Sequence, residues 1–296
     1  RRQKIMPSLD DLKKRIASVK STQKITKAMK MVAAAKLKKA QESAEKGRPY
    51  SEKMQNIILN LTESINDPEN APKLLVGTGE DKTHLCVVMT ADKGLCGGFN
   101  TNICRLSKSH FEKILKENKI LKIITVGSKG LDQLKRKYGK YIIKKISFKD
   151  KKKITFKEAK EVGKVILDLF DKNEFDKCTL FYNNFKNVIT QIPQAQQIVP
   201  AEQNNKSEES KNFSYEFEPD EDEILEDLLP KNVSIQVFKA FLENAASEQG
   251  SRMTAMDNAT RNAGDLVDKL TINYNRSRQA AITKELIEII SGAESL

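Results

Sequence analysis

The C-terminal part of the chain constrains the fold most, because its apolar residues keep one phase of a seven-residue repeat from Ile235 to Leu270. Steps of three and four residues place side chains on one face of an α-helix, so the pattern predicts a long helix with an apolar seam. Polar residues interrupt the seam at Gln249 and Arg252. A seam of this length requires a partner helix beside it. The seam residues are Ile235, Phe238, Leu242, Ala245, Met256, Ala259, Ala263, Leu266 and Leu270.

The last turns of this predicted helix have a different pattern. Beyond Leu270 the repeat meets Asn273 and Ser277, and the apolar residues then spread around most of the helix. A helix that is apolar on most sides must be surrounded by protein or lipid. This run is too short and too charged to span a bilayer, so we expect a sleeve of protein around it. The residues expected inside the sleeve are Ile282, Leu286, Ile289 and Ile290.

The N-terminal part predicts a second long helix, which begins at Ser8. Gly47 and Pro49 predict a kink or a break before a further helical run over residues 51–65. Because both helices have an apolar seam, pairing them as an antiparallel coiled coil buries the most apolar surface. The seam residues of the N-terminal helix are Leu9, Leu12, Ile16, Val19, Ala33, Leu37, Ala40 and Ala44.

The polar interruptions of the two seams predict their register. The N-terminal seam is interrupted over residues 23–30, and the C-terminal seam is interrupted at Gln249 and Arg252. If these interruptions lie side by side, Leu9 faces Val267. The last turns of the C-terminal helix then extend beyond the end of the N-terminal helix.

The N-terminal helix is strongly basic, since residues 12–41 contain ten Lys or Arg residues and no acidic residue. A helix without acids forgoes stabilising i,i+4 ion pairs, so we predict an acidic partner rather than a merely solvated face. A basic coiled-coil nucleic-acid-binding protein is the alternative, given the net charge of +12. The chain has no Trp and 6% aromatic residues, which argues against that alternative.

Residues 83–200 predict an α/β domain with a Rossmann-like, mostly parallel sheet, because strand and helix patterns alternate. The helical patterns cover residues 100–117, 129–138 and 156–170, and the strand patterns cover residues 85–90, 121–126, 141–146, 177–182 and 188–199.

A glycine cluster follows the first predicted strand, at Gly94, Gly97 and Gly98. The G-x-G-x-x-G spacing of dinucleotide sites and the P-loop pattern are both absent. We therefore expect the glycines to permit a tight turn from strand to helix, with no cofactor bound. A dehydrogenase-like enzyme that uses this cluster is the alternative.

No group of nucleophile, base and orienting residue can be identified in the sequence, so we predict a non-catalytic protein. The four Cys and two His residues have no metal-ligand spacing, and we expect no metal. Residues 201–230 contain eight acids between Glu216 and Asp227 and predict an acidic loop or linker, with Pro230 just before the C-terminal helix. The predicted domains are a coiled-coil shaft of residues 1–70 and 231–296, an α/β foot of residues 83–200, and a linker of residues 201–230.

Three stretches of the chain resemble the γ subunit of F-type ATP synthases, namely SVKSTQKITKAMKMVAAAKLKKAQ, TADKGLCGGFN and SRMTAMDNATRNAGDLVDKLTINYNRSRQAAITKELIEIISGAESL. The resemblance implies a central stalk, or rotor shaft, that transmits torque between a membrane proton-carrying ring and a catalytic head. The implied partners are the catalytic and non-catalytic head subunits, small stalk subunits of the δ or ε type, and the ring. It implies neither nucleic-acid binding nor a membrane span of its own.

The C-terminal stretch is most similar to the mitochondrial branch of that family. The chain also begins without an initiator Met, as after removal of a targeting peptide. Both features lead us to expect the matrix side of the mitochondrial inner membrane.

The resemblance also implies contact residues in the shaft. Arg278, Gln279 and Thr283 would hydrogen-bond a loop of a catalytic subunit, and the apolar tip would turn within a hydrophobic sleeve. Met29 matches a position near acidic loops of the catalytic subunits. The basic residues expected to face these loops are Lys24, Lys27 and Lys30.

Overall fold

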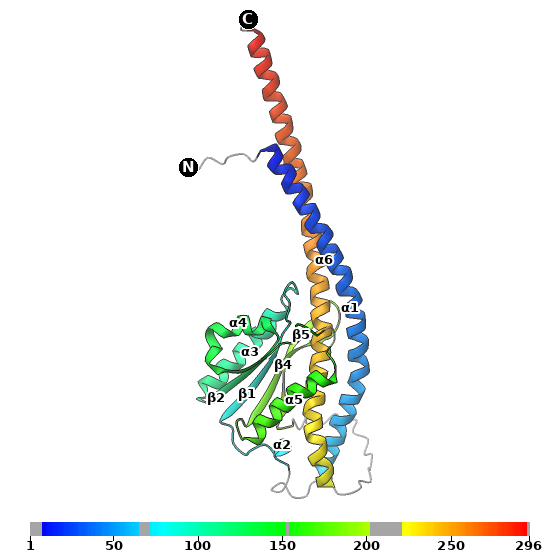
Figure 1. Cartoon of the computed structure of the whole chain (residues 1–296), viewed down its shortest axis with the longest axis vertical. Helices are drawn as coiled ribbons and strands as arrows, with labels where there is room; N and C mark the ends of the chain where they lie inside the picture. The colour runs from blue at the N-terminus through cyan, green and yellow to red at the C-terminus, as the bar shows by residue number, and fades with distance from the viewer. Residues whose placement is uncertain (1–7, 65–71, 152–153, 202–220, 295–296) are drawn as a thin grey trace. The chain divides into compact units, whose positions relative to one another are not determined.

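The computed structural model describes residues 8–64, 72–151, 154–201 and 221–294. The chain forms two compact units: unit 1 comprises Arg1–Ala33 and Met253–Leu296, and unit 2 comprises Ala34–Arg252. Two long helices, α1 (Leu9–Ser64) and α6 (Glu221–Glu294), contribute to both units (Figure 1). The predicted fold class is confirmed: an α/β sheet accompanies a pair of long terminal helices. The domain limits predicted from the sequence stay predictions.

Unit 2 contains a five-stranded sheet of order β3-β2-β1-β4-β5. The first four strands are parallel, and the edge strand β5 runs antiparallel to β4. Each strand overlaps one of the five predicted segments. A continuous apolar run such as residues 85–89, which are all buried, is typical of a strand covered on both faces. The strands are β1 (Thr83–Met89), β2 (Ile120–Val126), β3 (Ile142–Ile146), β4 (Lys177–Phe185) and β5 (Gln191–Val199).

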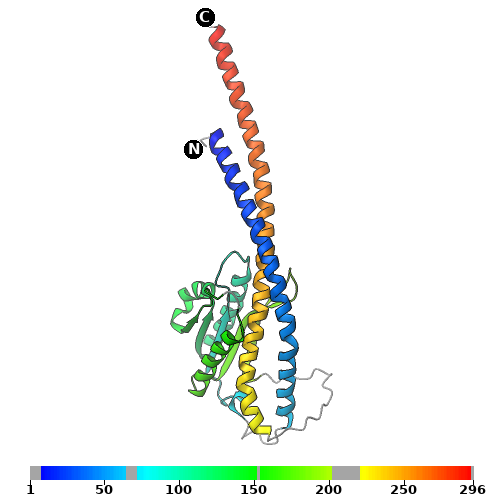
Figure 2. The ribbon, with the colours of Figure 1, turned by 45° about the vertical axis from the view of Figure 1, so that its right-hand side comes forward.

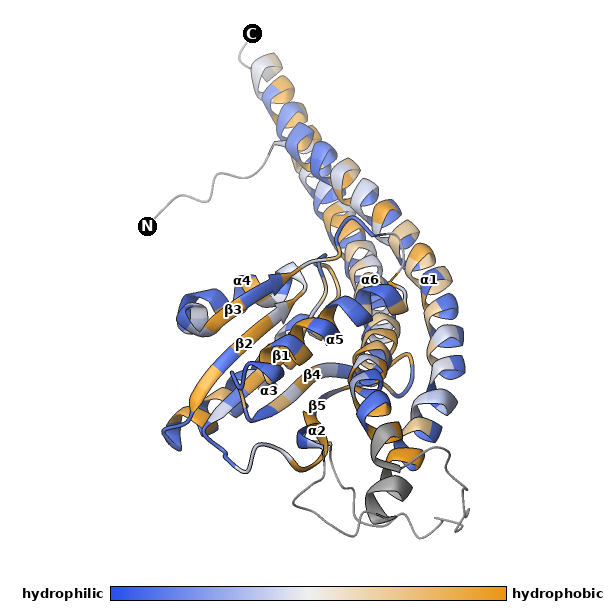
Figure 3. Cartoon of the chain, turned by 60° about the horizontal axis from the view of Figure 1, so that its bottom comes forward, coloured by the Kyte–Doolittle hydropathy of each residue, from blue (hydrophilic) through white to orange (hydrophobic). Residues whose placement is uncertain are grey.

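Helices cover both faces of the sheet (Figure 3). On one face, Cys86 and Val88 of β1 pack with α3 and α4. On the other face, Leu85 and Val87 pack with α5 and with the part of α6 in unit 2. The alternation along β1 follows from the two-residue period of a strand. The helices and the short 3-10 turn are α2 (Lys73–Val76), α3 (Phe99–Lys116), α4 (Ser128–Tyr138), η1 (Gly139–Tyr141) and α5 (Phe156–Asp171).

Of the kink or break expected at Pro49, the break is contradicted, and so is the expectation that α6 begins after Pro230. Helix α1 continues through Pro49 without a break, and α6 begins before Pro230, so residues 221–230 are helix rather than linker. A proline inside a helix costs ~3 kcal/mol. Burial of Leu225 and Leu229 in the contact of α6 with α1 and α2 contributes ~2 kcal/mol for each side chain and offsets that cost. The other predicted linker residues, 202–220, lie outside the described ranges.

In unit 1 the two helices lie side by side and run antiparallel, as predicted (Figure 2). Lys30 Nζ lies 2.6 Å from Asp257 Oδ1, and the Thr260 hydroxyl donates to the Thr26 hydroxyl at 2.8 Å. From the first pair to the second, the residue number decreases on α1 and increases on α6, so the two helices run antiparallel. The last turns of α6 extend past the first residues of α1 (Figure 1).

The predicted register is wrong by about three helical turns. Lys30 meets Asp257, whereas the prediction placed the polar segment 23–30 beside Gln249 and Arg252. Arg252 instead pairs with a glutamate of its own helix, Glu248, at 2.7 Å. The prediction failed because Thr26 and Lys30 hydrogen-bond Thr260 and Asp257 rather than lying beside Gln249 and Arg252.

Candidate functional site

The glycine loop, residues 94–98, turns the chain from β1 into α3. Leu95 and Gly97 have φ angles of 62° and 56°, in the left-handed region that glycine adopts without steric cost. Gly98 is the N-cap residue of α3, and a Cβ added at Gly94 would meet no atom within 4 Å. The three predicted turn glycines therefore lie together at the carboxyl end of β1.

Helix α6 contacts this loop. In a Rossmann-like sheet a ligand binds at the carboxyl ends of the strands where the strand order reverses, here between β1 and β4. The Ser251 hydroxyl donates to the Cys96 carbonyl at 2.7 Å, and the Ser247 hydroxyl donates to the Asn183 carbonyl at 3.0 Å. The loop and the neighbouring strand β4 therefore use backbone carbonyls to bind a helix of the same chain. The dehydrogenase-like alternative is not supported.

A partly buried ion pair connects α1, α6 and β4 within unit 2. Arg48 Nε donates to Glu243 Oε1 at 2.7 Å, and Arg48 Nη2 donates to Glu243 Oε2 at 3.1 Å. The Glu243 side chain is 3% exposed and also accepts the Phe185 N–H at 3.0 Å. The hydrogen bond to Glu243 raises the pKa of Arg48. These contacts hold α1 and α6 against β4 within unit 2.

Most basic side chains of residues 12–41 have no carboxylate partner in the part of the chain that the structure describes. The two exceptions are Lys14, which pairs with Asp10 at 2.8 Å, and Lys30, which pairs with Asp257 at 2.6 Å. The hydrogen bond from Lys30 lowers the pKa of Asp257. An excess of unpaired positive charge therefore lies along α1. The other predicted contact residues of α1 are the exposed Lys24 and Lys27 and the half-buried Met29.

The predicted contact residues of α6 are exposed and lie within two turns of one another. Arg278, Gln279 and Thr283 are exposed, and the Thr283 hydroxyl donates to the Gln279 carbonyl at 2.9 Å. The apolar tip that follows is also exposed, which is unusual for large aliphatic side chains grouped on one helix. The exposed fractions are 49% for Ile282, 53% for Leu286, 67% for Ile289 and 57% for Ile290.

The polar layer of the shaft was missed by the sequence analysis. Gln23, Thr26 and Lys30 interrupt the N-terminal seam, and the sequence predicts the wrong partners for them. The structure places Gly264 against Gln23, where an added Cβ would lie 3.0 Å from the amide nitrogen. A glycine next to the seam of one helix, facing a long polar residue in the seam of the other, is the signal that could have found this pairing.

Neither a metal site nor a membrane-spanning helix is found in the described ranges. No three His, Cys, Asp or Glu side chains there are grouped so that they could hold a metal ion. None of the helices there combines the length and apolar composition that crossing a lipid bilayer requires.

Comparison with known proteins places the chain in a family. A family model described as ATP synthase matches residues 8–296. The ATP synthase gamma chain of Pelagibacter ubique (strain HTCC1062) is 73% identical over 291 residues, which cover 98% of this chain and 100% of that protein. The chain belongs to the ATP synthase gamma chain family. The resemblance seen in the sequence is thereby confirmed. Another gamma chain, from Sinorhizobium medicae (strain WSM419), is 57% identical over 98% of this chain and 100% of its own length.

Solved structures also match this family member. The central stalk and c-ring structure of the Tetrahymena thermophila mitochondrial ATP synthase contains a chain with 28% identity and a TM-score of 0.59, covering 79% of this chain and 99% of that one. A chain of the Euglena gracilis mitochondrial ATP synthase has a TM-score of 0.68 over 97% of this chain and 94% of that one. Its 21% identity supports the fold alone.

Proposed function

We propose that this chain is the central-stalk rotor subunit of an F-type ATP synthase, which transmits torque between the proton-driven membrane ring and the catalytic head. The observation that carries the proposal is the 73% identity to a gamma chain over 98% of this chain. The paired helices of unit 1 provide the shaft that such a role requires. The partners are the head subunits, the small central-stalk subunits and the membrane ring. The family match does not support the alternative that the chain is a basic coiled-coil nucleic-acid-binding protein.

The shaft acts through contacts that form and break as it turns. Exposed charge pairs contribute ~0–1 kcal/mol each, so they can be exchanged readily between neighbouring head subunits. We propose that Arg278, Lys24 and Lys27 form such charge pairs. Arg278, Gln279 and Thr283 would also hydrogen-bond a loop of a catalytic subunit. Their exposure supports this assignment.

Two further residues of α1 have a more internal position. Lys30 pairs with Asp257 across the shaft, and Met29 is half-buried. We propose that Met29 lies at the edge of the surface that meets the acidic loops. We propose that Lys30 contacts the same acidic loops while it keeps its ion pair with Asp257.

The apolar tip is the part of the shaft that most needs a partner. Covering a large aliphatic side chain contributes ~1.5–3 kcal/mol relative to leaving it in water. A hydrophobic sleeve in the head would bury Ile282, Leu286, Ile289 and Ile290 while allowing rotation, because apolar contacts have no directional hydrogen bonds to break.

The chain is a subunit of a membrane-associated complex, and we propose that it has no catalytic activity of its own. The contacts of α6 with the glycine loop and β4 support this. The finer location, on the matrix side of the mitochondrial inner membrane, stays a prediction, and the relatives at 73% and 57% identity are bacterial. Membrane fractionation of the source cells, with immunodetection of the chain, tests it.

Substitution of one exposed arginine tests the proposed function. Arg278→Ala in the assembled complex should lower the number of protons pumped per ATP hydrolysed and leave the melting temperature of the chain nearly unchanged. Arg276→Ala is the matched control, since Arg276 is also exposed on the same helix. Unchanged pumping combined with a large fall in melting temperature would assign Arg278 to folding instead.

A further inference from the structure

A strongly basic surface lies at the β3 edge of the sheet in unit 2. Residues 129–151 contain nine Lys or Arg residues and two acidic residues. They belong to α4, η1, β3 and the loop that follows, and α4 lies beside β3 (Figure 3). A positive surface of this density attracts an anionic partner. We call it the basic edge, and its exposed cations are Lys135, Arg136, Lys137, Lys140, Lys144 and Lys145.

Most of the charge on the basic edge is not neutralised within the chain. Lys135 lies 3.6 Å from an Asp132 carboxylate oxygen, and Lys137 lies 2.7 Å from one of Glu112. Both pairs are exposed to solvent, which weakens them and lets another anion replace them. The cations of the basic edge with no carboxylate partner in the described ranges are Arg136, Lys140, Lys144 and Lys145.

The backbone of β3 is unsuited to pairing with a strand of another chain. In its register with β2, Ile142 lies opposite Ile123 and Lys144 lies opposite Ile124, so Ile143 forms a bulge. A bulge and exposed lysines on an edge strand both obstruct the addition of a further strand. A partner of the basic edge therefore meets its side chains rather than the hydrogen-bonding groups of its backbone.

The side chains among these cations are those found where proteins meet a bilayer surface. Ile143 is 44% exposed, and the half-buried Tyr141 ring has its centroid 4.8 Å from Lys140 Nζ. Lysine and arginine stems lie along apolar surface while their charges reach outward, and tyrosine prefers the level of the lipid headgroups. A bilayer presents phosphates at every position, so it fits cations that are spread along an edge.

We propose that the basic edge binds the surface of an anionic lipid bilayer, with its cations at the headgroup phosphates and Ile143 just beneath them. A bilayer is available to this chain because it is a subunit of a membrane-associated complex. Torque transmission does not require this contact, so the inference goes beyond the proposed function. Attraction between spread cations and headgroups has no fixed geometry, so it holds the edge near the bilayer while lipids exchange.

Sedimentation with vesicles tests the charge. The soluble complex of head and central stalk, containing the full-length chain, is sedimented with vesicles of phosphatidylcholine alone or in equal mixture with phosphatidylglycerol. One lysine near an anionic surface raises affinity about fivefold, so Lys144→Gln/Lys145→Gln should lower binding to the mixed vesicles about 25-fold. The matched control is Lys160→Gln/Lys164→Gln, which removes two exposed lysines from α5 and should leave binding nearly unchanged.

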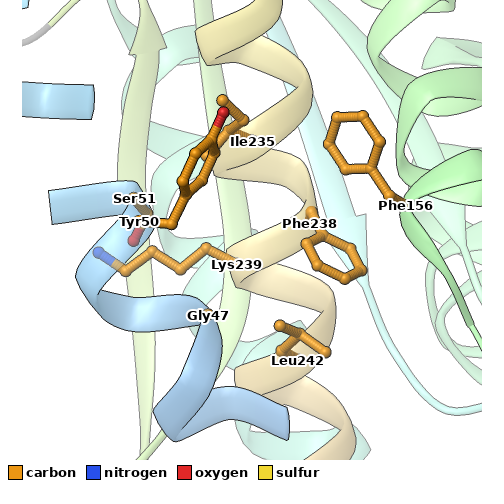
Figure 4. Close-up of a pocket in the computed structure, with 8 residues that line it drawn as sticks. All are labelled: Gly47, Tyr50, Ser51, Phe156, Ile235, Phe238, Lys239 and Leu242. Carbon is orange, nitrogen blue, oxygen red and sulfur yellow. The ribbon is translucent and has the colours of Figure 1, made fainter. Parts of the chain in front are cut away.

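A fluorescent label tests the contact itself. Ile143→Cys is labelled with a polarity-sensitive nitrobenzoxadiazole before assembly, since the four natural cysteines are buried. Its emission should shift to shorter wavelength with mixed vesicles and stay unchanged with neutral ones. The control label is Tyr50→Cys, because Tyr50 is 61% exposed at an apolar recess where α1, α5 and α6 meet (Figure 4). Lys239 is the one charged residue lining that recess among those described, so this label should not shift.

Three results would overturn the inference. The first is binding to mixed vesicles that is no stronger than binding to neutral ones, and the second is binding that Lys144→Gln/Lys145→Gln changes by less than about twofold. The third is loss of a protein subunit from that variant with vesicle binding retained, which would make the partner an acidic protein. All three leave the chain in the complex, whereas absence of the unaltered chain from the complex would refute the proposed function itself.

Discussion

A disulfide across the shaft tests the register of unit 1 directly. The Thr260 hydroxyl donates to the Thr26 hydroxyl at 2.8 Å, so these side chains meet at their γ atoms. Cysteines at both positions place two sulfur atoms there, and a disulfide of ~2.05 Å requires only a small further approach. The four natural cysteines are buried and should not compete. We expect the Thr26→Cys/Thr260→Cys variant to crosslink under mild oxidation.

The size of the stabilisation follows from the length of chain that the crosslink closes. Positions 26 and 260 are 234 residues apart. The chain-entropy relation gives ~5 kcal/mol for a loop of this length. With a urea m value of ~3 kcal/mol/M, the unfolding midpoint should rise by ~1.7 M between the reduced and the oxidised protein. Circular dichroism of the purified chain in urea, with and without reductant, measures the shift.

The matched control is the Val19→Cys/Asp257→Cys variant, which pairs residues according to the register predicted from the sequence. It should remain uncrosslinked. If this control crosslinks and the 26/260 pair does not, the register seen in the structure is wrong. Loss of ATP-driven proton pumping on oxidation of the 26/260 variant in the complex would refute the view that the two helices turn as one body.

Arg48→Ala should lower the free energy of unfolding by ~3 kcal/mol, measured by urea denaturation, because it leaves the Glu243 carboxylate buried without its cation; a change below ~1 kcal/mol would contradict this. Hydrogen bonds at the start of α5 lower the pKa of Glu158 from 4.5 to about 2. The carboxylate of Glu158 therefore stabilises the fold fully above pH 4.5, and this contribution is lost as the pH falls toward 2. In Glu158→Gln the unfolding midpoint should therefore fall less steeply between pH 4.5 and pH 2 than in the unchanged protein. Gly127→Ala should destabilise unit 2 by at least ~2 kcal/mol, since φ is +96° and the new Cβ would lie 2.2 Å from a backbone oxygen. Gly94→Ala, with open space around it, is the control and should fold normally.

Most of the elements could be predicted from the sequence because their patterns are local. The buried run of β1 and the amphipathic pattern of α5 each identify an element without reference to the rest of the chain. The candidate contact residues came instead from a resemblance, and their exposure agrees with that assignment. The recess around Lys239 could not be predicted, since α1, α5 and α6 meet there from distant parts of the sequence.

The sequence by itself determined that two long helices with apolar seams must pair and that an alternating sheet domain lies between them. Periodicity alone shows which face of a helix is apolar. The tertiary structure decided which residues meet: Lys30 with Asp257 in the shaft, and Arg48 with Glu243 in unit 2. It also decided that helix continues through Pro49 and Pro230. The physical reason is that a polar seam residue or a helix proline is tolerated only when contacts from a distant segment offset its cost, and those contacts exist only in the folded chain.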